Sequence, residues 1–126
     1  MAGHFELKVS DMFSSAHSLR GYEGNCERIH GHNWKVDVVV ACHELDDQGL
    51  GVDFRDLKRA LKDVLEDLDH KNLNDVEPFD RVNPSSENLA SYIFSQLEKR
   101  VSDNILLMRV TVWESESACA SYVMDR

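Results

Sequence analysis

The fold of this chain is decided by residues 34–41, which read WKVDVVVA. Successive side chains of a β-strand point to opposite sides of the sheet. Trp34 and the valines at even-numbered positions therefore share one face, while Lys35 and Asp37 lie on the other. An aromatic and β-branched face opposite a charged one is typical of a half-buried strand. We expect this strand to pack its apolar face on the core.

A candidate metal-binding motif directly precedes this strand. His30 and His32 are two positions apart, so on an extended backbone they point to the same face, and Gly31 between them leaves room for close approach. Imidazole nitrogens suit Zn²⁺ at about 2.0–2.1 Å, and a catalytic zinc keeps one position open beside three protein ligands. The motif predicts two ligands of such a site. The alternative is a pair of surface histidines in a loop.

The third ligand is not decided by the pattern of residues. Four other histidines remain: His4, His17, His43 and His70. Of these, His17 ends the segment FSSAH at residues 13–17, just past the first expected strand and close in the chain to the histidine pair. His17 is therefore a candidate, and the others stay open.

Cys26 lies four residues before His30 and is a candidate reactive thiol. Its polar and charged neighbours argue against deep burial. Arg28 and a nearby metal would favour the thiolate form, which suits a general base or nucleophile. Two alternatives remain, a small buried apolar residue and a fourth ligand of a closed structural zinc site.

The remaining elements follow from hydrophobic spacing. Residues 5–9 alternate as in a strand, and Asp53 is placed to cap a helix that begins at Phe54 and ends near Leu68. Ser85 or Ser86 can cap a second helix. Residues 108–114 and 118–124 predict two more strands, with Met108, Val110 and Val112 on one face. The order ββααββ predicts a single α+β domain over residues 1–126, with a four-stranded antiparallel sheet and two helices on one face.

Two acidic positions also attract attention. Glu114 continues the apolar face of the strand at residues 108–114, so it needs a partner that a ligand's N–H groups could supply. The alternative is that the strand has ended and Glu114 is exposed. Asp69 and His70 are adjacent at a helix end, where a solvated acid and a histidine favoured by the helix dipole are an adequate explanation.

Composition excludes some classes of function. The net charge is −9, which argues against nucleic acid as a direct partner, because phosphate binding needs a basic surface. No apolar run approaches the ~20 residues of a membrane span. The first residues lack the pattern of a signal peptide, and the three cysteines are an odd number with no CxxC. We expect a cytoplasmic protein with reduced thiols and no membrane partner.

Five stretches together resemble the 6-pyruvoyl-tetrahydropterin synthase superfamily, in the right order and along nearly the whole chain. They are residues 13–17, 26–34, 68–74, 83–90 and 112–114. The resemblance implies the tunnelling fold of that superfamily. Cys26 and the histidine pair have the spacing Cys-x₃-His-x-His, which is similar to bacterial members that make 6-carboxy-tetrahydropterin for queuosine, whereas pyruvoyl-forming members usually carry a longer insertion there.

The resemblance also implies roles for named residues. The zinc ligands would be His17, His30 and His32. The catalytic residues would be Cys26 as the proton-abstracting thiolate and Asp69 with His70 as a proton relay, usually supplied by a neighbouring subunit. The pterin-binding residues would be Glu114 and, more loosely, Ser85, Ser86 and Glu87.

The activity that the resemblance implies is that of a zinc-dependent lyase. Its substrate would be 7,8-dihydroneopterin triphosphate, and its products 6-carboxy-5,6,7,8-tetrahydropterin, acetaldehyde and triphosphate. The first alternative is a pyruvoyl synthase, which eliminates triphosphate and keeps the side chain. The second is a non-catalytic binding module stabilised by zinc. The expected assembly is a homo-oligomer, a hexamer of two trimers with paired strand edges and sites at the subunit interfaces.

Overall fold

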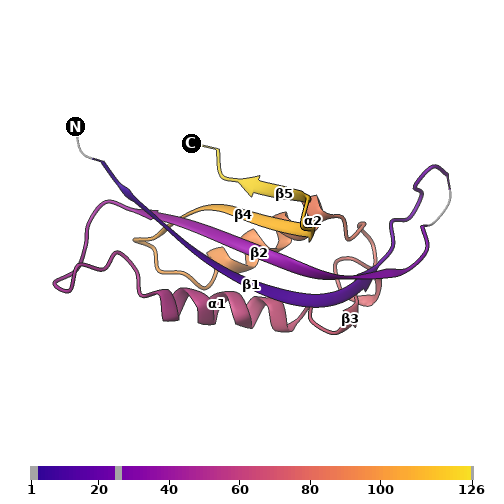
Figure 1. The fold of residues 1–126 in the computed structure, drawn as a ribbon, viewed down its shortest axis with the longest axis horizontal. Helices are drawn as coiled ribbons and strands as arrows, with labels where there is room; N and C mark the ends of the chain where they lie inside the picture. Colours follow the sequence, from indigo (N-terminus) through magenta and orange to yellow (C-terminus); the bar gives the residue numbers. More distant parts are fainter. Residues whose placement is uncertain (1–2, 25–26, 126) are drawn as a thin grey trace.

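The structure is a computed structural model that describes residues 3–24 and 27–125, and it consists of one twisted sheet with helices on one side (Figure 1). The sheet has five strands in the order β3-β1-β2-β4-β5. The elements are β1 (Phe5–His17), β2 (His30–Cys42), α1 (Phe54–Glu66), β3 (Lys71–Asn72), α2 (Ser86–Glu98), β4 (Leu106–Ser115) and β5 (Ala118–Val123), with a short 3₁₀ helix at Leu73–Asp75.

The predicted four-stranded antiparallel sheet is correct for the four long strands and wrong for the sheet as a whole. The long strands β1, β2, β4 and β5 do pair antiparallel. The chain leaving α1 adds the two-residue strand β3 to the free edge of β1, and this pairing is parallel, with Ser15 opposite Lys71 and Ala16 opposite Asn72. The sheet is therefore mixed, because a short segment finds backbone partners on an edge that would otherwise be unpaired.

The apolar face of the sheet forms the core with both helices. Trp34, Val36, Val38 and Val40 of β2 are fully buried, as residues 34–41 predict. The same core contains the apolar sides of the two helices: Leu57, Leu61, Val64 and Leu65 of α1, and Leu89, Ala90, Ile93, Phe94 and Leu97 of α2. α1 packs on β1, while α2 packs on β4 and β5 (Figure 1). The opposite face of the sheet carries no helix among the described residues.

The pairing of β1 with β2 is longer than the hydrophobic pattern predicts. It joins thirteen residue pairs, from Phe5 opposite Cys42 to His17 opposite His30. His17 is therefore the last residue of the first strand and does not lie past it. The hydrophobic pattern does not predict this longer strand, because residues 10–15 are mostly polar and do not alternate regularly between polar and apolar.

The end of α1 and the buried face of β4 differ from expectation, while the cap of α2 is one of the two expected serines. α1 ends at Glu66, so Leu68 is buried just beyond the helix instead of within its last turn. Ser85 caps α2 by accepting a hydrogen bond from the Asn88 N–H. A register shift where β2 pairs with β4 also turns β4 locally, so Leu107 is buried while Met108 is only half-buried. Within the described residues, no helix has the length and apolarity needed to span a membrane.

The helix-free face carries a buried carboxylate at its centre. Asp37 is only 7% exposed, and it accepts hydrogen bonds from the Ser10 hydroxyl and the Trp113 indole N–H. Burial disfavours its charged form, but those two hydrogen bonds and the ammonium groups of Lys8 and Lys35 outweigh burial and lower the pKa of Asp37 below its ordinary value. A charged group thus ties β1, β2 and β4 together.

We expect Asp37→Asn to reduce the free energy of unfolding by about 1–3 kcal/mol at neutral pH, because charge-assisted hydrogen bonds are lost. The folded-state pKa of Asp37 is lowered, so its contribution is present above the ordinary carboxyl pKa and is lost as the pH falls through the folded-state value. Urea unfolding of both proteins at fixed concentration, from neutral to acid pH, measures this. A difference in the free energy of unfolding between the two proteins that persists unchanged into strong acid would contradict the assignment. The control is Asp47→Asn, which removes a carboxylate in an exposed loop.

Candidate metal centre and pterin site

Three histidines meet where β1 ends and β2 begins. The ring centroids of His17 and His30 are 4.7 Å apart, those of His17 and His32 are 5.1 Å apart, and those of His30 and His32 are 4.8 Å apart. The indole of Trp34 contacts the rings of His17 and His32 edge-on at 4.8 and 5.0 Å. The strand register produces this cluster, because paired residues on one face lie side by side.

Backbone carbonyls orient two of these rings. His17 Nδ1 lies 2.7 Å from the Pro84 carbonyl oxygen, and His30 Nδ1 lies 2.8 Å from that of Arg28. A carbonyl only accepts, so each Nδ1 carries the proton and each Nε2 keeps its lone pair. Among the described residues, the buried Nε2 atoms of His17 and His32 have no hydrogen-bond partner. This is the donor set that a metal ion bound by neutral imidazoles requires.

The Glu114 carboxylate completes a group of four. The ligand atoms of His17, His30, His32 and Glu114 all lie within 4.8 Å of one another. Glu114 Oε1 is 3.6 Å from His32 Nε2, and the Ser86 hydroxyl is 3.5 Å from Glu114 Oε2. The residue that continues the apolar face of β4 thus has its carboxylate beside the histidines, a proximity that the strand pattern alone does not predict.

The electrostatics of His32 suit a neutral ligand. Burial lowers the pKa of His32, Glu114 acts against this, and the neighbouring His17 and His30 lower it further. Imidazole binds a metal only in its neutral form. Three neutral imidazoles with a carboxylate beside them match the nitrogen and oxygen donors that Zn²⁺ takes in proteins.

Two asparagine side chains hold the segment that follows His17. Asn74 accepts a hydrogen bond from the Ser18 N–H and donates one to the Ser18 carbonyl. Asn83 makes the same pair of bonds with the backbone of Arg20. Each side-chain amide satisfies one backbone N–H and one backbone carbonyl, as a paired strand would. The backbone after β1 therefore has hydrogen-bond partners although it lies outside the sheet. Nothing in the local pattern of the sequence reveals these clamps.

The guanidinium of Arg20 binds backbone carbonyls. It donates to the carbonyl oxygens of Phe79 at 2.6 Å, Asn74 at 3.2 Å and Val82 at 3.4 Å. These contacts fasten the loop that precedes α2 and that includes Pro84, the hydrogen-bond partner of His17. Arg20 therefore supports the orientation of a metal-site histidine indirectly.

The loop between β1 and β2 is closed at its base. The Glu27 N–H donates to the Leu19 carbonyl at 2.9 Å, and the Leu19 N–H donates to the Glu27 carboxylate at 3.3 Å. Cys26 belongs to this loop but lies outside the described residues. Its predicted catalytic role therefore stays a prediction.

Asp69 and His70 form a hydrogen-bonded pair at the edge of the sheet. His70 Nδ1 is 2.9 Å from Asp69 Oδ2, and the ring is largely exposed. Asp69 also accepts a bond from the Ser14 N–H; this bond and that from His70 outweigh partial desolvation and lower the pKa of Asp69. His70 has a positive φ of 56°, and its N–H donates to the Ser14 carbonyl. No hydrogen bond or ion pair among the described residues joins this pair to the three histidines.

The other predicted pterin-binding residues lie at the start of α2. Ser85 is occupied as the helix cap, Ser86 is near Glu114, and Glu87 is exposed in the first turn. Of the three, only Ser86 has a contact that links it to the histidine group.

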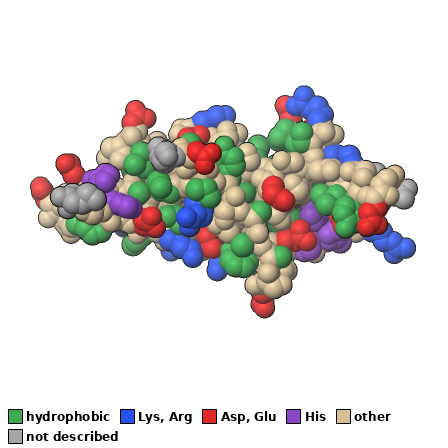
Figure 2. All heavy atoms as spheres, turned by 90° about the horizontal axis from the view of Figure 1, so that it is seen from above, with side chains coloured by type: hydrophobic (Ala, Val, Ile, Leu, Met, Phe, Trp, Pro, Cys, Tyr) green, Lys and Arg blue, Asp and Glu red, His purple; other side chains and the backbone are tan. Residues whose placement is uncertain are grey.

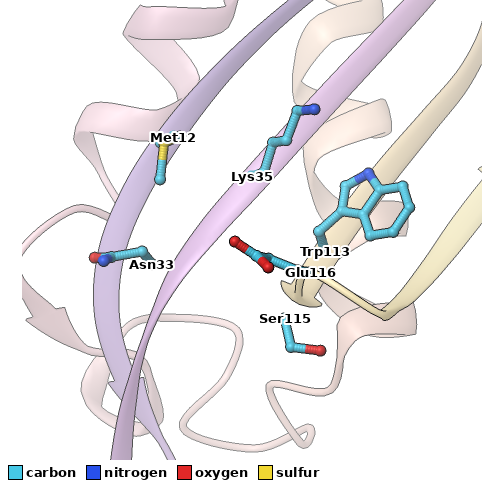
Figure 3. Close-up of a pocket in the computed structure, with 6 residues that line it drawn as sticks. All are labelled: Met12, Asn33, Lys35, Trp113, Ser115 and Glu116. Atoms are coloured by element: carbon cyan, nitrogen blue, oxygen red, sulfur yellow. The ribbon is translucent and has the colours of Figure 1, made fainter.

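A separate hollow of about 560 Å³ lies on the helix-free face (Figure 3). It is lined by Met12, Asn33, Lys35, Trp113, Ser115 and Glu116. None of these residues belongs to the histidine group, which lies on the face of the sheet that also packs the helices. We place the candidate functional site at the histidines. Buried ring nitrogens that converge and lack a hydrogen-bond partner indicate a ligand site more specifically than the volume of a hollow does.

The fold and the site define a class: a T-fold domain with three histidines and a glutamate gathered at the end of its central hairpin. The sequence profile named 6-pyruvoyl tetrahydropterin synthase matches residues 6–125. The chain belongs to this family, which confirms the resemblance.

Individual relatives carry different names. The 6-carboxy-5,6,7,8-tetrahydropterin synthase of Synechocystis is 35% identical over 90% of this chain and 89% of its own length. The dihydroneopterin monophosphate aldolase of Pyrococcus furiosus is 34% identical over 81% of this chain and 82% of its own length. The structure of 6-pyruvoyl tetrahydropterin synthase from Caenorhabditis elegans superposes with a TM-score of 0.83 at 26% identity and covers 98% of both chains.

We expect His30→Ala to lower Zn²⁺ affinity by more than about 100-fold, since even partners outside the first coordination shell cost 10–100-fold. Metal content after dialysis against a competing chelator measures this. Histidines gather at both ends of the long axis (Figure 2), and His43, which contacts His4 away from the cluster, supplies the control His43→Ala. Full metal content in His30→Ala would contradict the assignment.

Proposed function

We propose that this chain is a zinc-dependent lyase of queuosine biosynthesis. It would convert 7,8-dihydroneopterin triphosphate and water to 6-carboxy-5,6,7,8-tetrahydropterin, acetaldehyde and triphosphate. The observation that carries the proposal is the group of His17, His30 and His32, with unpartnered nitrogens beside the Glu114 carboxylate. The Cys-x₃-His-x-His spacing and the name of the Synechocystis relative support this reaction over its alternatives.

Each part of the site has a task in this proposal. His17, His30 and His32 hold the metal, and Pro84 and Arg28 fix two of the rings through their carbonyls. A bound Zn²⁺ supplies Lewis acidity toward the hydroxyl oxygens of the substrate side chain. Glu114 accepts hydrogen bonds from the amino and ring N–H groups of the pterin, which orients the side chain toward the histidines.

Proton transfer falls to Cys26 and to the pair of Asp69 and His70. Cys26 removes a proton from the side chain as a thiolate. Asp69 holds the Nδ1–H of His70, which leaves His70 Nε2 free to accept and return a proton. The His70 ring projects from the sheet edge with most of its surface exposed, and this supports a role in the site of a neighbouring subunit.

Product analysis separates this reaction from its alternatives. The purified protein is incubated with dihydroneopterin triphosphate, and the products are identified by mass spectrometry with an aldehyde assay. We expect acetaldehyde and the carboxylated pterin. Triphosphate release without an aldehyde would indicate a pyruvoyl synthase. A phosphate-bearing two-carbon aldehyde would indicate an aldolase, the activity in the name of the Pyrococcus furiosus relative. Binding without turnover would indicate a zinc-stabilised module.

We expect Cys26→Ala to keep its zinc and its fold but to lose about 10²–10⁴-fold in turnover, the usual range for a positioned acid–base group. Zinc content and turnover are measured on the same sample, with the exposed Cys119→Ala as control. Loss of zinc together with activity would instead make Cys26 a metal ligand.

We propose further that the chain assembles into a hexamer of two trimers, with sites between subunits. β3 has only two residues and β5 six, so both edges of the sheet retain backbone groups able to pair with another chain. Tyr122 and Val123 of β5 are also about half exposed. Sedimentation equilibrium should give about six times the 14.4 kDa mass of one chain. A stable and fully active monomer would contradict this assembly.

A further inference from the structure

Glu114 lies at a bulge in β4. In the pairing of β4 with β5, Trp113 lies opposite Cys119 and Ser115 lies opposite Ala118. Two residues of β4 therefore advance against one of β5, and Glu114 has no residue opposite it. Such bulges redirect a side chain and often occur beside functional sites. Here the residue without a partner in β5 is the one whose carboxylate lies 3.6 Å from His32 Nε2.

The distance from Glu114 to His32 suits two ligands of one ion. At 3.6 Å, Glu114 Oε1 is too far from His32 Nε2 for a hydrogen bond. Ligands at about 2.0–2.2 Å from a tetrahedral zinc lie about 3.3–3.6 Å from each other. All four ligand atoms of the group lie within 4.8 Å of one another, so a small inward movement brings each within reach of a single ion.

Glu114 is held loosely enough to move. Its side chain is 40% exposed, and among the described residues its other oxygen has a single hydrogen-bond contact, the long 3.5 Å one with the Ser86 hydroxyl. Among the described residues, no lysine or arginine forms an ion pair with it. One carboxylate oxygen is thus directed toward the histidines and the other toward the start of α2.

We propose that Glu114 is a displaceable fourth ligand, which coordinates the metal through Oε1 when no pterin is bound and leaves it when the pterin N–H groups engage the carboxylate. The fourth position would then open only when substrate is present. The first half rests on the proposed metal centre, and the second on the proposed pterin-binding role of Glu114. No covalent bond changes in this exchange.

Metal affinity tests the first half without any catalytic reaction. We expect Glu114→Gln and Glu114→Ala to bind Zn²⁺ at least about 10-fold more weakly than the wild type, because a direct ligand should be worth no less than an outer-sphere partner. Glu116→Gln removes the same charge two residues further on and is the matched control. The proposal would be overturned if both Glu114 variants bound Zn²⁺ with an affinity within threefold of the wild type and had unchanged circular dichroism.

Cobalt substitution reports the ligands directly. Azide binds Co²⁺ at the fourth coordination position. If Glu114 occupies that position, azide has to displace the carboxylate in the wild-type Co²⁺ protein, but it has to displace only water in Glu114→Gln. We expect at least about 10-fold tighter azide binding to that variant, with a changed visible spectrum, and wild-type behaviour in Glu116→Gln, which controls for the lost charge. Equal azide affinity and identical spectra in all three proteins would overturn the proposal.

6-Methylpterin, which keeps the pterin N–H groups but has no side-chain hydroxyl to bind the metal, tests the displacement. Once binding is established by fluorescence, it should change the cobalt spectrum of the wild type and increase azide affinity toward that of Glu114→Gln. 6-Methylpterin that binds without altering the cobalt spectrum would overturn the exchange. Because neither measurement involves turnover, the ligand role of Glu114 is decided independently of whether the protein proves to be a lyase.

Discussion

The register between β1 and β2 is the constraint on which the candidate site depends. Side chains alternate faces along a strand, so a slip of one residue would move His17 to the opposite face from His30 and His32. The buried alternation of β2 prevents this slip, because it would expose Trp34 and bury Lys35. The core that stabilises the sheet therefore also brings the three histidines together, while the Pro84 and Arg28 carbonyls orient two of the rings.

This dependence explains how much could be predicted from the sequence. The alternation at residues 34–41 and the helical spacing after Asp53 predict the elements that the core requires. His30 and His32 could be paired because they share one strand. His17 could not be chosen over the other histidines by spacing, because its proximity to them arises from strand pairing. The family resemblance supplied that choice.

Other features depend on contacts between distant segments, and no local pattern encodes them. β3 forms because Lys71 and Asn72 lie beside the edge of β1 and pair with it, although neither residue has a high strand propensity. Asp37 was expected on a polar face, and it is buried there because Trp113 packs over it from a strand seventy-six residues away. The two asparagine clamps have the same origin. Each required the folded chain before it could be recognised.

The closed base of the loop between β1 and β2 has an evolutionary consequence. The bonds between Leu19 and Glu27 join the two ends of the loop next to the strands. Insertions within that loop would leave the pairing of His17 with His30 intact, since flexible loops tolerate added length at small entropic cost. The length of this loop could thus change among relatives while the cluster of His17, His30 and His32 keeps its geometry.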